Sequence, residues 1–188
     1  MPVVLASASP RRHELLARAG VSFEVLVSPA EEIHDAAMEP EALCELNATL
    51  KAEAVAAHRP EATVIGADTL VFIDGEPLGK PAGLDEARDM LRRLSGRTHR
   101  VCTGVCVIFP DRPARIFHDI TEVDFLPLDD EAIDAYFALV NPFDKAGAYG
   151  IQEHGEMIVA SIRGNFDNVM GLPVDMLAAV LRGESDCG

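Results

Sequence analysis

Leu5-Ala6-Ser7-Ala8-Ser9-Pro10-Arg11-Arg12 is the stretch that decides the fold, because it joins an apolar strand to the start of a helix. Ser9 suits the N-cap position of that helix, and Pro10 suits its first turn. Backbone amides at a helix N-terminus attract anions, whereas two adjacent arginines are disfavoured there unless an anion is bound. The stretch therefore predicts a phosphate site, and the alternative is a solvated helix start with ordinary surface arginines.

Length, composition and the absence of targeting segments predict a cytoplasmic protein of one domain. The chain has 188 residues, of which 48% are hydrophobic, enough for a sizeable core in one domain or in one sheet with two lobes. Its 31 acidic and 16 basic residues give a formal charge of −15, which argues against general binding to nucleic acid polymers or anionic membranes. No stretch is apolar and long enough for a membrane helix. Any anion site must therefore be local.

Cysteine and histidine spacing does not indicate a transition-metal site. The four cysteines follow no zinc-like spacing, and free thiols in a reducing compartment are expected for Cys44, Cys102, Cys106 and Cys187. The six histidines are scattered, without a paired helical spacing. The sequence also lacks a Gly-x-Ser-x-Gly elbow and a Walker P-loop.

Strand-like and helix-like segments alternate along the chain, which predicts a mixed, twisted sheet with helices packed on it. Asp74-Gly75 predicts a hairpin turn. We expect strands at residues 2–5, 23–27, 63–66, 70–73, 100–109, 114–125 and 157–162. We expect helices from Pro10 to Gly20 and at residues 41–58, 84–94, 130–140 and 173–181, with a loop at 165–172.

Asp68 is the first candidate for chemistry. It follows the buried strand at 63–66, and α/β folds place reacting side chains at strand ends. Such a carboxylate can bind a cation or orient a water molecule, and the alternative is a turn or capping aspartate. Glu31 and Glu32 are adjacent, so in an extended segment only one of them would face a site.

Lys51 and Lys80 are candidates for neutralising phosphate charge. Lys51 follows leucines at helical spacing and so borders a buried face, while Lys80 lies between Gly79 and Pro81, which restrict its backbone. The alternative for both is a solvated surface lysine.

Five motifs together resemble the Maf family of nucleotide pyrophosphatases. They are LASASPRR at 5–12, GADT at 66–69, GKP at 79–81, DKAGAYGIQ at 144–152 and NVMGLP at 168–173. The resemblance runs from residue 3 to about residue 181 in the expected order. It implies a fold similar to that of inosine triphosphatases, with a nucleotide cleft between two lobes of a single domain spanning residues 1–188. It also implies a house-cleaning enzyme that splits nucleoside triphosphates into monophosphate and pyrophosphate with a divalent metal, Mg²⁺ or Mn²⁺.

The resemblance also implies roles for individual residues. Asp68 matches the family's general base, and with Glu32 it would hold the metal. The residues that match the phosphate and metal pocket are Ser9, Arg12, Glu32, Lys51 and Lys80. Those that match the positions separating the family's subgroups are Arg11, Thr69 and Gln152, and in this combination they resemble the dTTP/UTP subgroup.

A glutamine amide can both donate and accept, which complements O4 and N3–H of thymine or uracil and supports Gln152 as a base contact. Two alternatives remain. The first is a pyrophosphatase for modified nucleotides such as 7-methyl-GTP, and the second is a nucleotide sensor that regulates septum formation through a partner. The resemblance further implies a homodimer.

Overall fold

The computed structural model describes residues 1–183. The described helices are α1 Pro10–Arg18, α2 Pro40–Ala56, α3 Leu84–Leu94, α4 Asp130–Phe137, α5 Phe166–Met170 and α6 Val174–Arg182, with 3-10 turns η1 Ala146–Ala148 and η2 Gly155–Met157. The described strands are β1 Val3–Leu5, β2 Glu24–Val25, β3 Thr63–Ile73, β4 Glu76–Leu78, β5 Thr98–Ile108, β6 Arg115–Phe125 and β7 Val159–Arg163.

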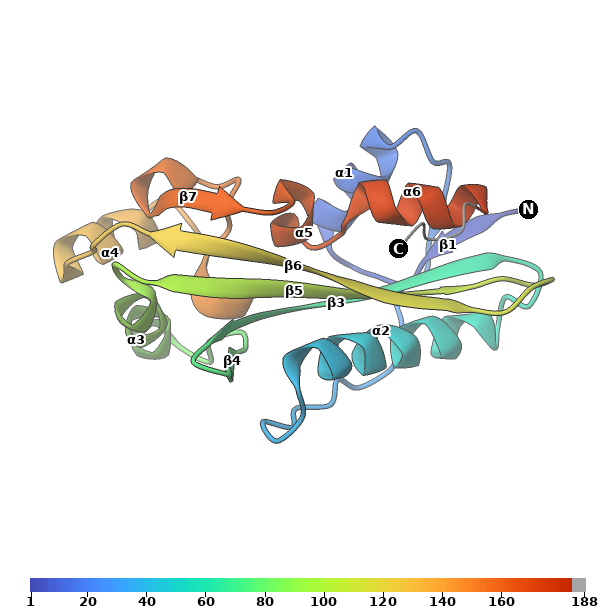
Figure 1. The fold of residues 1–188 in the computed structure, drawn as a ribbon, viewed down its shortest axis with the longest axis horizontal. Helices are drawn as coiled ribbons and strands as arrows, with labels where there is room; N and C mark the ends of the chain where they lie inside the picture. Colours follow the sequence, from blue (N-terminus) through green and yellow to red (C-terminus); the bar gives the residue numbers. More distant parts are fainter. Residues whose placement is uncertain (184–188) are drawn as a thin grey trace. The chain divides into compact units, whose positions relative to one another are not determined.

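The strands form one mixed sheet, as predicted. Its order is β2-β1-β3-β5-β6-β7, and β4 pairs with β3 (Figure 1). β1 is parallel to both β2 and β3, with Val4 opposite Val64. β3 and β4 are antiparallel, as are β6 and β7. Asp74 and Gly75 both have positive φ between β3 and β4, which confirms the predicted hairpin turn.

Two compact units divide the described chain. The first contains Met1–Asp68, Thr103–Asp119 and the described residues from Gly171 onward, and the second contains Thr69–Cys102 and Ile120–Met170. The long strands β3, β5 and β6 each contribute residues to both units.

In the first unit, α1 and α6 lie on one side of the strands and α2 lies on the other (Figure 1). The side facing α2 has a core of small apolar residues: Val4, Ala6, Ala48, Ala52, Val55, Ala62, Val64 and Cys106. The other side buries Leu15 and Leu16 of α1 and Leu177 of α6. Both faces of these strands are therefore covered, as expected for parallel pairing.

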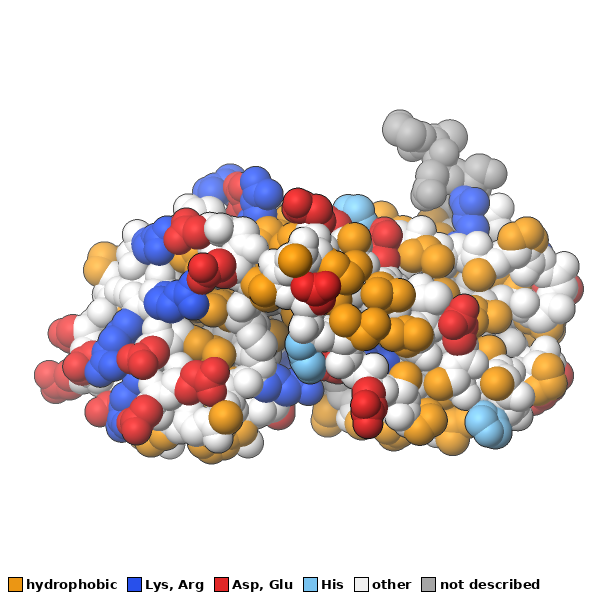
Figure 2. Space-filling model, turned by 90° about the horizontal axis from the view of Figure 1, so that it is seen from below, with side chains coloured by type: hydrophobic (Ala, Val, Ile, Leu, Met, Phe, Trp, Pro, Cys, Tyr) orange, Lys and Arg blue, Asp and Glu red, His pale blue; other side chains and the backbone are white. Residues whose placement is uncertain are grey.

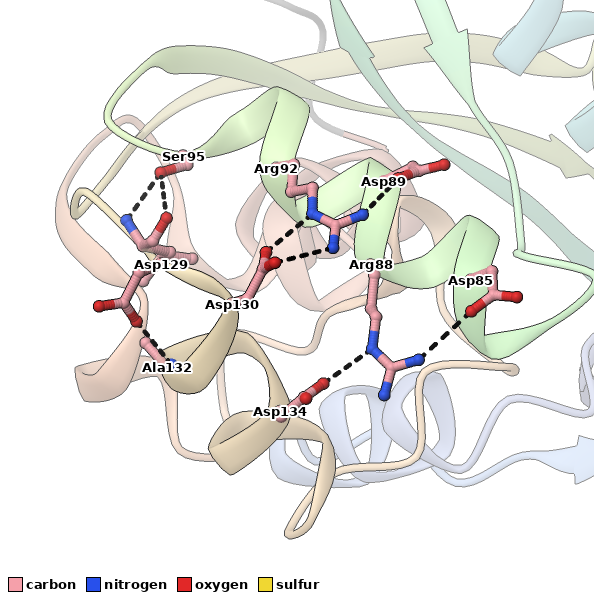
Figure 3. Close-up of polar contacts among 10 residues, drawn as sticks. Asp85, Arg88, Asp89, Arg92, Ser95, Asp129, Asp130, Ala132 and Asp134 are labelled. Atoms are coloured by element: carbon pink, nitrogen blue, oxygen red, sulfur yellow. Dashed lines mark hydrogen bonds and ion pairs between the residues drawn. The ribbon is translucent and has the colours of Figure 1, made fainter.

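In the second unit, α3 packs against α4. Arginines of α3 join aspartates of α4 across this contact (Figure 3): Arg88 Nε donates to Asp134, and Arg92 donates to both oxygens of Asp130. Asp129 caps α4 by accepting from the Ala132 amide. Exposed ion pairs of this kind contribute little to stability.

The same unit contains a buried aromatic cluster. The rings of His99, Phe125 and Tyr149 meet edge to face, and His99 Nε2 lies 2.7 Å from the Tyr149 hydroxyl. Burial lowers the pKa of His99 from its ordinary 6.5 to about 4. His99 is therefore neutral at physiological pH.

Several predicted elements differ from the structure. The strand expected at 23–27 is shortened to Glu24–Val25. The loop expected at 165–172 contains the helix α5, because Asn165 accepts from the Asp167 amide and starts a helical turn where sequence reasoning saw only a break. The expectation of free thiols is confirmed for Cys44, Cys102 and Cys106, while Cys187 lies outside the described residues.

On the face drawn in Figure 2, basic side chains lie among acidic ones and do not form a broad basic surface. This mixture of charges on the drawn face agrees with the net charge of −15. Within residues 1–183, no helix has the length and apolar character needed to cross a membrane.

Candidate active site

Asp68 lies at the centre of a compact charged cluster in the first unit. The Lys51 ammonium lies 2.7 Å from Asp68 Oδ1 and 2.7 Å from Glu32 Oε1. The side chains of Asp68 and Lys51 are only 7% and 12% exposed, and that of Glu32 is 35% exposed. The lysine therefore bridges two carboxylates from distant parts of the sequence, and it is Glu32 of the Glu31-Glu32 pair that contacts it.

The position of Asp68 corrects a prediction. Sequence reasoning placed it where a strand ends, but β3 continues without interruption from Thr63 to Ile73. Neighbouring side chains on one face of a strand are two residues apart, so Gly66 and Asp68 both face α2.

α2 approaches β3 and β5 unusually closely because glycines face it. A Cβ on Gly66 would lie 2.8 Å from the Ala52 nitrogen, and a Cβ on Gly104 would lie 2.6 Å from the Glu45 nitrogen. Only glycine leaves room for the helix backbone there. The close approach brings Asn47 and Lys51, one helical turn apart, within reach of Asp68.

The turn between β1 and α1 is organised by Ser7. Its hydroxyl accepts from the Ser9 amide and from Arg12 Nη1, each at 3.2 Å. Arg12 Nε donates to the Gly171 carbonyl at 2.8 Å. Ser9 occupies the N-cap position as predicted, but its side chain makes no capping hydrogen bond. The guanidinium of Arg12 is thus held in place before any ligand arrives.

Electrostatics link Arg12 to the carboxylate cluster. Burial lowers the pKa of Arg12, while the charges of Asp68 and Glu32 act in the opposite direction. An arginine stays charged in either case. Two cations, Arg12 and Lys51, therefore share the field of two carboxylates, and an entering polyanion would gain both cations as partners.

The donor set fits a hard divalent cation that is shared with a substrate. Oxygens of Asp68 and Glu32 both lie 2.7 Å from one lysine nitrogen, so they are at most about 5.4 Å apart. Among residues 1–183, no group of three or more His, Cys, Asp or Glu side chains could hold a metal alone. Mg²⁺ is commonly bound by one or two carboxylates together with substrate phosphates, and this set has that character.

The structure brings together only part of the predicted site. Ser9, Arg12, Glu32, Lys51 and Asp68 all belong to the first unit, and Arg11 follows Pro10 in the first turn of α1.

The remaining predicted residues belong to the second unit. Thr69 follows Asp68 in β3, and its side chain points to the other face of the strand. Lys80 is exposed just after β4, next to Gly79, whose carbonyl accepts from the Gly147 amide. Gln152 is exposed, and its amide donates to Glu153 at 3.4 Å. Their roles stay predictions from the resemblance.

Sequence reasoning missed Ser7 and Asn47. Asn47 is four residues before Lys51, a spacing that places both on one helix face, and this signal was available. Ser7 is part of the quoted motif, but nothing in the sequence showed that its hydroxyl would bind Arg12.

Comparison with known proteins identifies the family of this chain. The sequence model of the Maf-like proteins matches residues 2–184. The chain belongs to the Maf family. A Maf relative of Akkermansia muciniphila, named dTTP/UTP pyrophosphatase, is 53% identical over 182 residues, covering 97% of this chain and 96% of that protein. A Nitratidesulfovibrio vulgaris protein of the same name is 47% identical, covering 99% of this chain and 90% of the relative.

The Maf chain also resembles a solved structure in fold. The structure of the Staphylococcus aureus Ham1 protein superposes with a TM-score of 0.59 at 18% identity, and the match covers 98% of this chain and all of the other. At this identity the likeness shows the fold alone. It confirms the prediction of a mixed α/β architecture.

Proposed function

We propose that this protein hydrolyses dTTP and UTP to the nucleoside monophosphate and pyrophosphate. The observation that carries the proposal is the cluster in which Lys51 bridges Asp68 and Glu32, with Arg12 in the same electrostatic field. Relatives that are 46–53% identical over nearly the whole chain are named dTTP/UTP pyrophosphatase, which supports the choice of substrate.

The proposed chemistry assigns each side chain a physical task. Asp68 is buried and acts as the general base that accepts the proton of the attacking water. Lys51 and Arg12 neutralise phosphate oxygens and stabilise the charge that develops on the pyrophosphate leaving group. Arg12 needs little reorganisation, since Ser7 and the Gly171 carbonyl already hold it.

Asp68 and Glu32 are the residues that would hold a divalent cation. When bound, Mg²⁺ or Mn²⁺ would supply Lewis-acid polarisation of the phosphate, in addition to the charge of the two cationic side chains.

For Ser9 and Lys80 we propose phosphate contacts, and for Arg11, Thr69 and Gln152 contacts that select the base. These assignments rest on the family resemblance. Gln152 presents both a donor and an acceptor, which suits the O4 and N3–H edge of a pyrimidine. The homodimer and the cytoplasmic location expected from sequence also stay proposals.

The test is a product analysis of purified protein with Mg²⁺ or Mn²⁺ and a panel of canonical and modified nucleoside triphosphates. Monophosphate plus pyrophosphate from dTTP and UTP, with little turnover of purines, is the expected result. Turnover confined to methylated nucleotides would keep the reaction and overturn the base assignment. No turnover of any nucleotide would overturn the enzyme proposal and favour a nucleotide sensor.

A further inference from the structure

Asn47 is a buried polar residue to which the mechanism assigns no task. It lies in α2 and is 2% exposed. Its Oδ1 accepts from the Ile33 amide at 2.8 Å, and its Nδ2 donates to the Ile33 carbonyl at 3.0 Å. The same Nδ2 donates to Asp68 Oδ2 at 3.3 Å. Both of its N–H donors and one acceptor position are therefore used.

The two hydrogen bonds from Asn47 pair with the Ile33 backbone in the way that a residue of a neighbouring β-strand would. One amide side chain satisfies both the N–H and the C=O of a single residue, which fixes the position and direction of the backbone at that point. Glu32 is the preceding residue, so the clamp also fixes where its side chain starts. The segment from 26 to 39 has no helix or strand of its own that could do this.

The third hydrogen bond, from Asn47 Nδ2 to Asp68, connects the segment from 26 to 39 to strand β3. Asp68 receives Asn47 on Oδ2 and Lys51 on Oδ1, so both of its oxygens are held by residues one helical turn apart. Glu32 receives the same Lys51 nitrogen. α2 thus holds both carboxylates, Asp68 directly and Glu32 through the Ile33 backbone and through Lys51.

We propose that Asn47 is a positioning residue that sets the separation of the Glu32 and Asp68 carboxylates for a divalent cation bound with the triphosphate. The inference rests on the proposed function. No other neutral side chain of this size offers one acceptor and two donors in one plane, so the role depends on the amide and not on its volume. Residues that orient metal ligands in this way typically change metal affinity about 10- to 100-fold when they are removed.

A merely structural role makes a different prediction. Loss of a buried hydrogen-bonded amide lowers stability wherever it lies. Loss of positioning additionally weakens cation binding, while turnover at saturating cation falls much less. Asn168 provides a matched control, because it is fully buried and its Nδ2 donates to the Val101 carbonyl and to Thr121, both in the second unit.

The experiment compares wild type with Asn47→Leu, Asn47→Ala and Asn168→Leu. Leucine is close to asparagine in shape and removes every hydrogen bond, and alanine serves if the leucine variant fails to fold. Electron paramagnetic resonance of free Mn²⁺ measures Mn²⁺ binding in the presence of a non-hydrolysable α,β-methylene analogue of dTTP. Mn²⁺-dependent dTTP hydrolysis is measured in parallel.

We expect the Mn²⁺ dissociation constant of both Asn47 variants to rise at least about tenfold, and that of Asn168→Leu to stay within about twofold of wild type. The Mn²⁺ concentration for half-maximal hydrolysis should rise in step. Unchanged Mn²⁺ affinity in the Asn47 variants, or an equal loss of affinity in Asn168→Leu, would overturn the inference about Asn47. The proposed function would still stand in that case, provided that the wild-type protein hydrolyses dTTP. A wild-type protein that neither binds Mn²⁺ nor hydrolyses dTTP would overturn both.

Discussion

Gly66→Ala should both destabilise the protein and weaken its activity, because α2 has no space to accept a methyl group. The added Cβ would lie 2.8 Å from the Ala52 nitrogen and closer still to the Ala48 carbonyl. These are backbone atoms of a helix, so relief requires α2 as a whole to move. Reaching an ordinary contact of 3.4 Å from the Ala52 nitrogen alone takes about 0.6 Å, and relieving the closer contact with the Ala48 carbonyl takes more.

That displacement is large on the scale of the site. A shift of about 0.6 Å directed away from Asp68 would lengthen the Asn47–Asp68 contact from 3.3 Å to as much as about 3.9 Å, beyond hydrogen-bond distance, and the Lys51–Asp68 contact from 2.7 Å to as much as about 3.3 Å. Overpacking of this kind destabilises by about 1–3 kcal/mol. We therefore expect the free energy of unfolding to fall by about 2 kcal/mol and kcat/KM for dTTP to fall as well.

Urea denaturation and steady-state kinetics measure the two effects, with Gly83→Ala as control. Gly83 has extended backbone and nothing within 4 Å of a built Cβ, so its replacement should change stability by less than about 1 kcal/mol. A Gly66→Ala protein that unfolds within about 0.5 kcal/mol of wild type would refute the close-approach argument.

Four further changes test other parts of the reasoning. Asp68→Asn should retain nucleotide binding but lower kcat by at least about 100-fold, the scale for loss of a general base, and near-normal turnover would remove Asp68 from that role. Gln152→Glu should lower kcat/KM for dTTP and UTP more than about tenfold, because a carboxylate cannot donate to O4; unchanged selectivity would show that this residue does not contact the base. The pKa of His99 is about 4 in the folded protein, below its unfolded value of 6.5, because burial favours the neutral ring. The resulting stabilisation is complete above pH 6.5 and is lost as the pH falls toward 4, by up to about 3 kcal/mol. His99→Phe should therefore show a flatter dependence of unfolding free energy on pH. Arg92→Gln should lower the Tm at low salt by removing the ion pair with Asp130. The difference in Tm from wild type should shrink in about 1 M NaCl, where exposed charges are strongly screened. A difference that does not depend on salt would contradict an electrostatic origin.

The element order was predictable because local signals and tertiary packing agree along most of the chain. The helix expected at 84–94 has acidic residues in its first turn, arginines in its last, and a break at Ser95, and it was found at Leu84–Leu94. The Asp74-Gly75 turn requires positive φ at both positions, which these residue types tolerate. These features depend on neighbours in sequence alone.

The environment of Asp68 was not predictable in the same way, because it depends on segments far apart in the chain. A carboxylate after a buried strand is typical of a strand end, but here Lys51 and Asn47 stabilise it inside β3. Their contribution overrides the low strand propensity of aspartate. The pairing of Glu32 with Lys51 likewise depends on the hydrogen bonds between Asn47 and the Ile33 backbone, which no local sequence pattern indicates.

The two glycines and the polar residues of α2 belong to one arrangement. Asparagine is short, so its amide reaches Asp68 only if the helix backbone lies close to the strand. That approach requires Gly66 and Gly104 on the sheet and small residues such as Ala48 and Ala52 on the helix, where larger side chains would bury more apolar area. The chain therefore gives up hydrophobic stabilisation at this contact in exchange for a fixed geometry of charged groups. This exchange accounts for a tightly packed, alanine-rich interface directly beside the buried carboxylate on which the proposed chemistry depends.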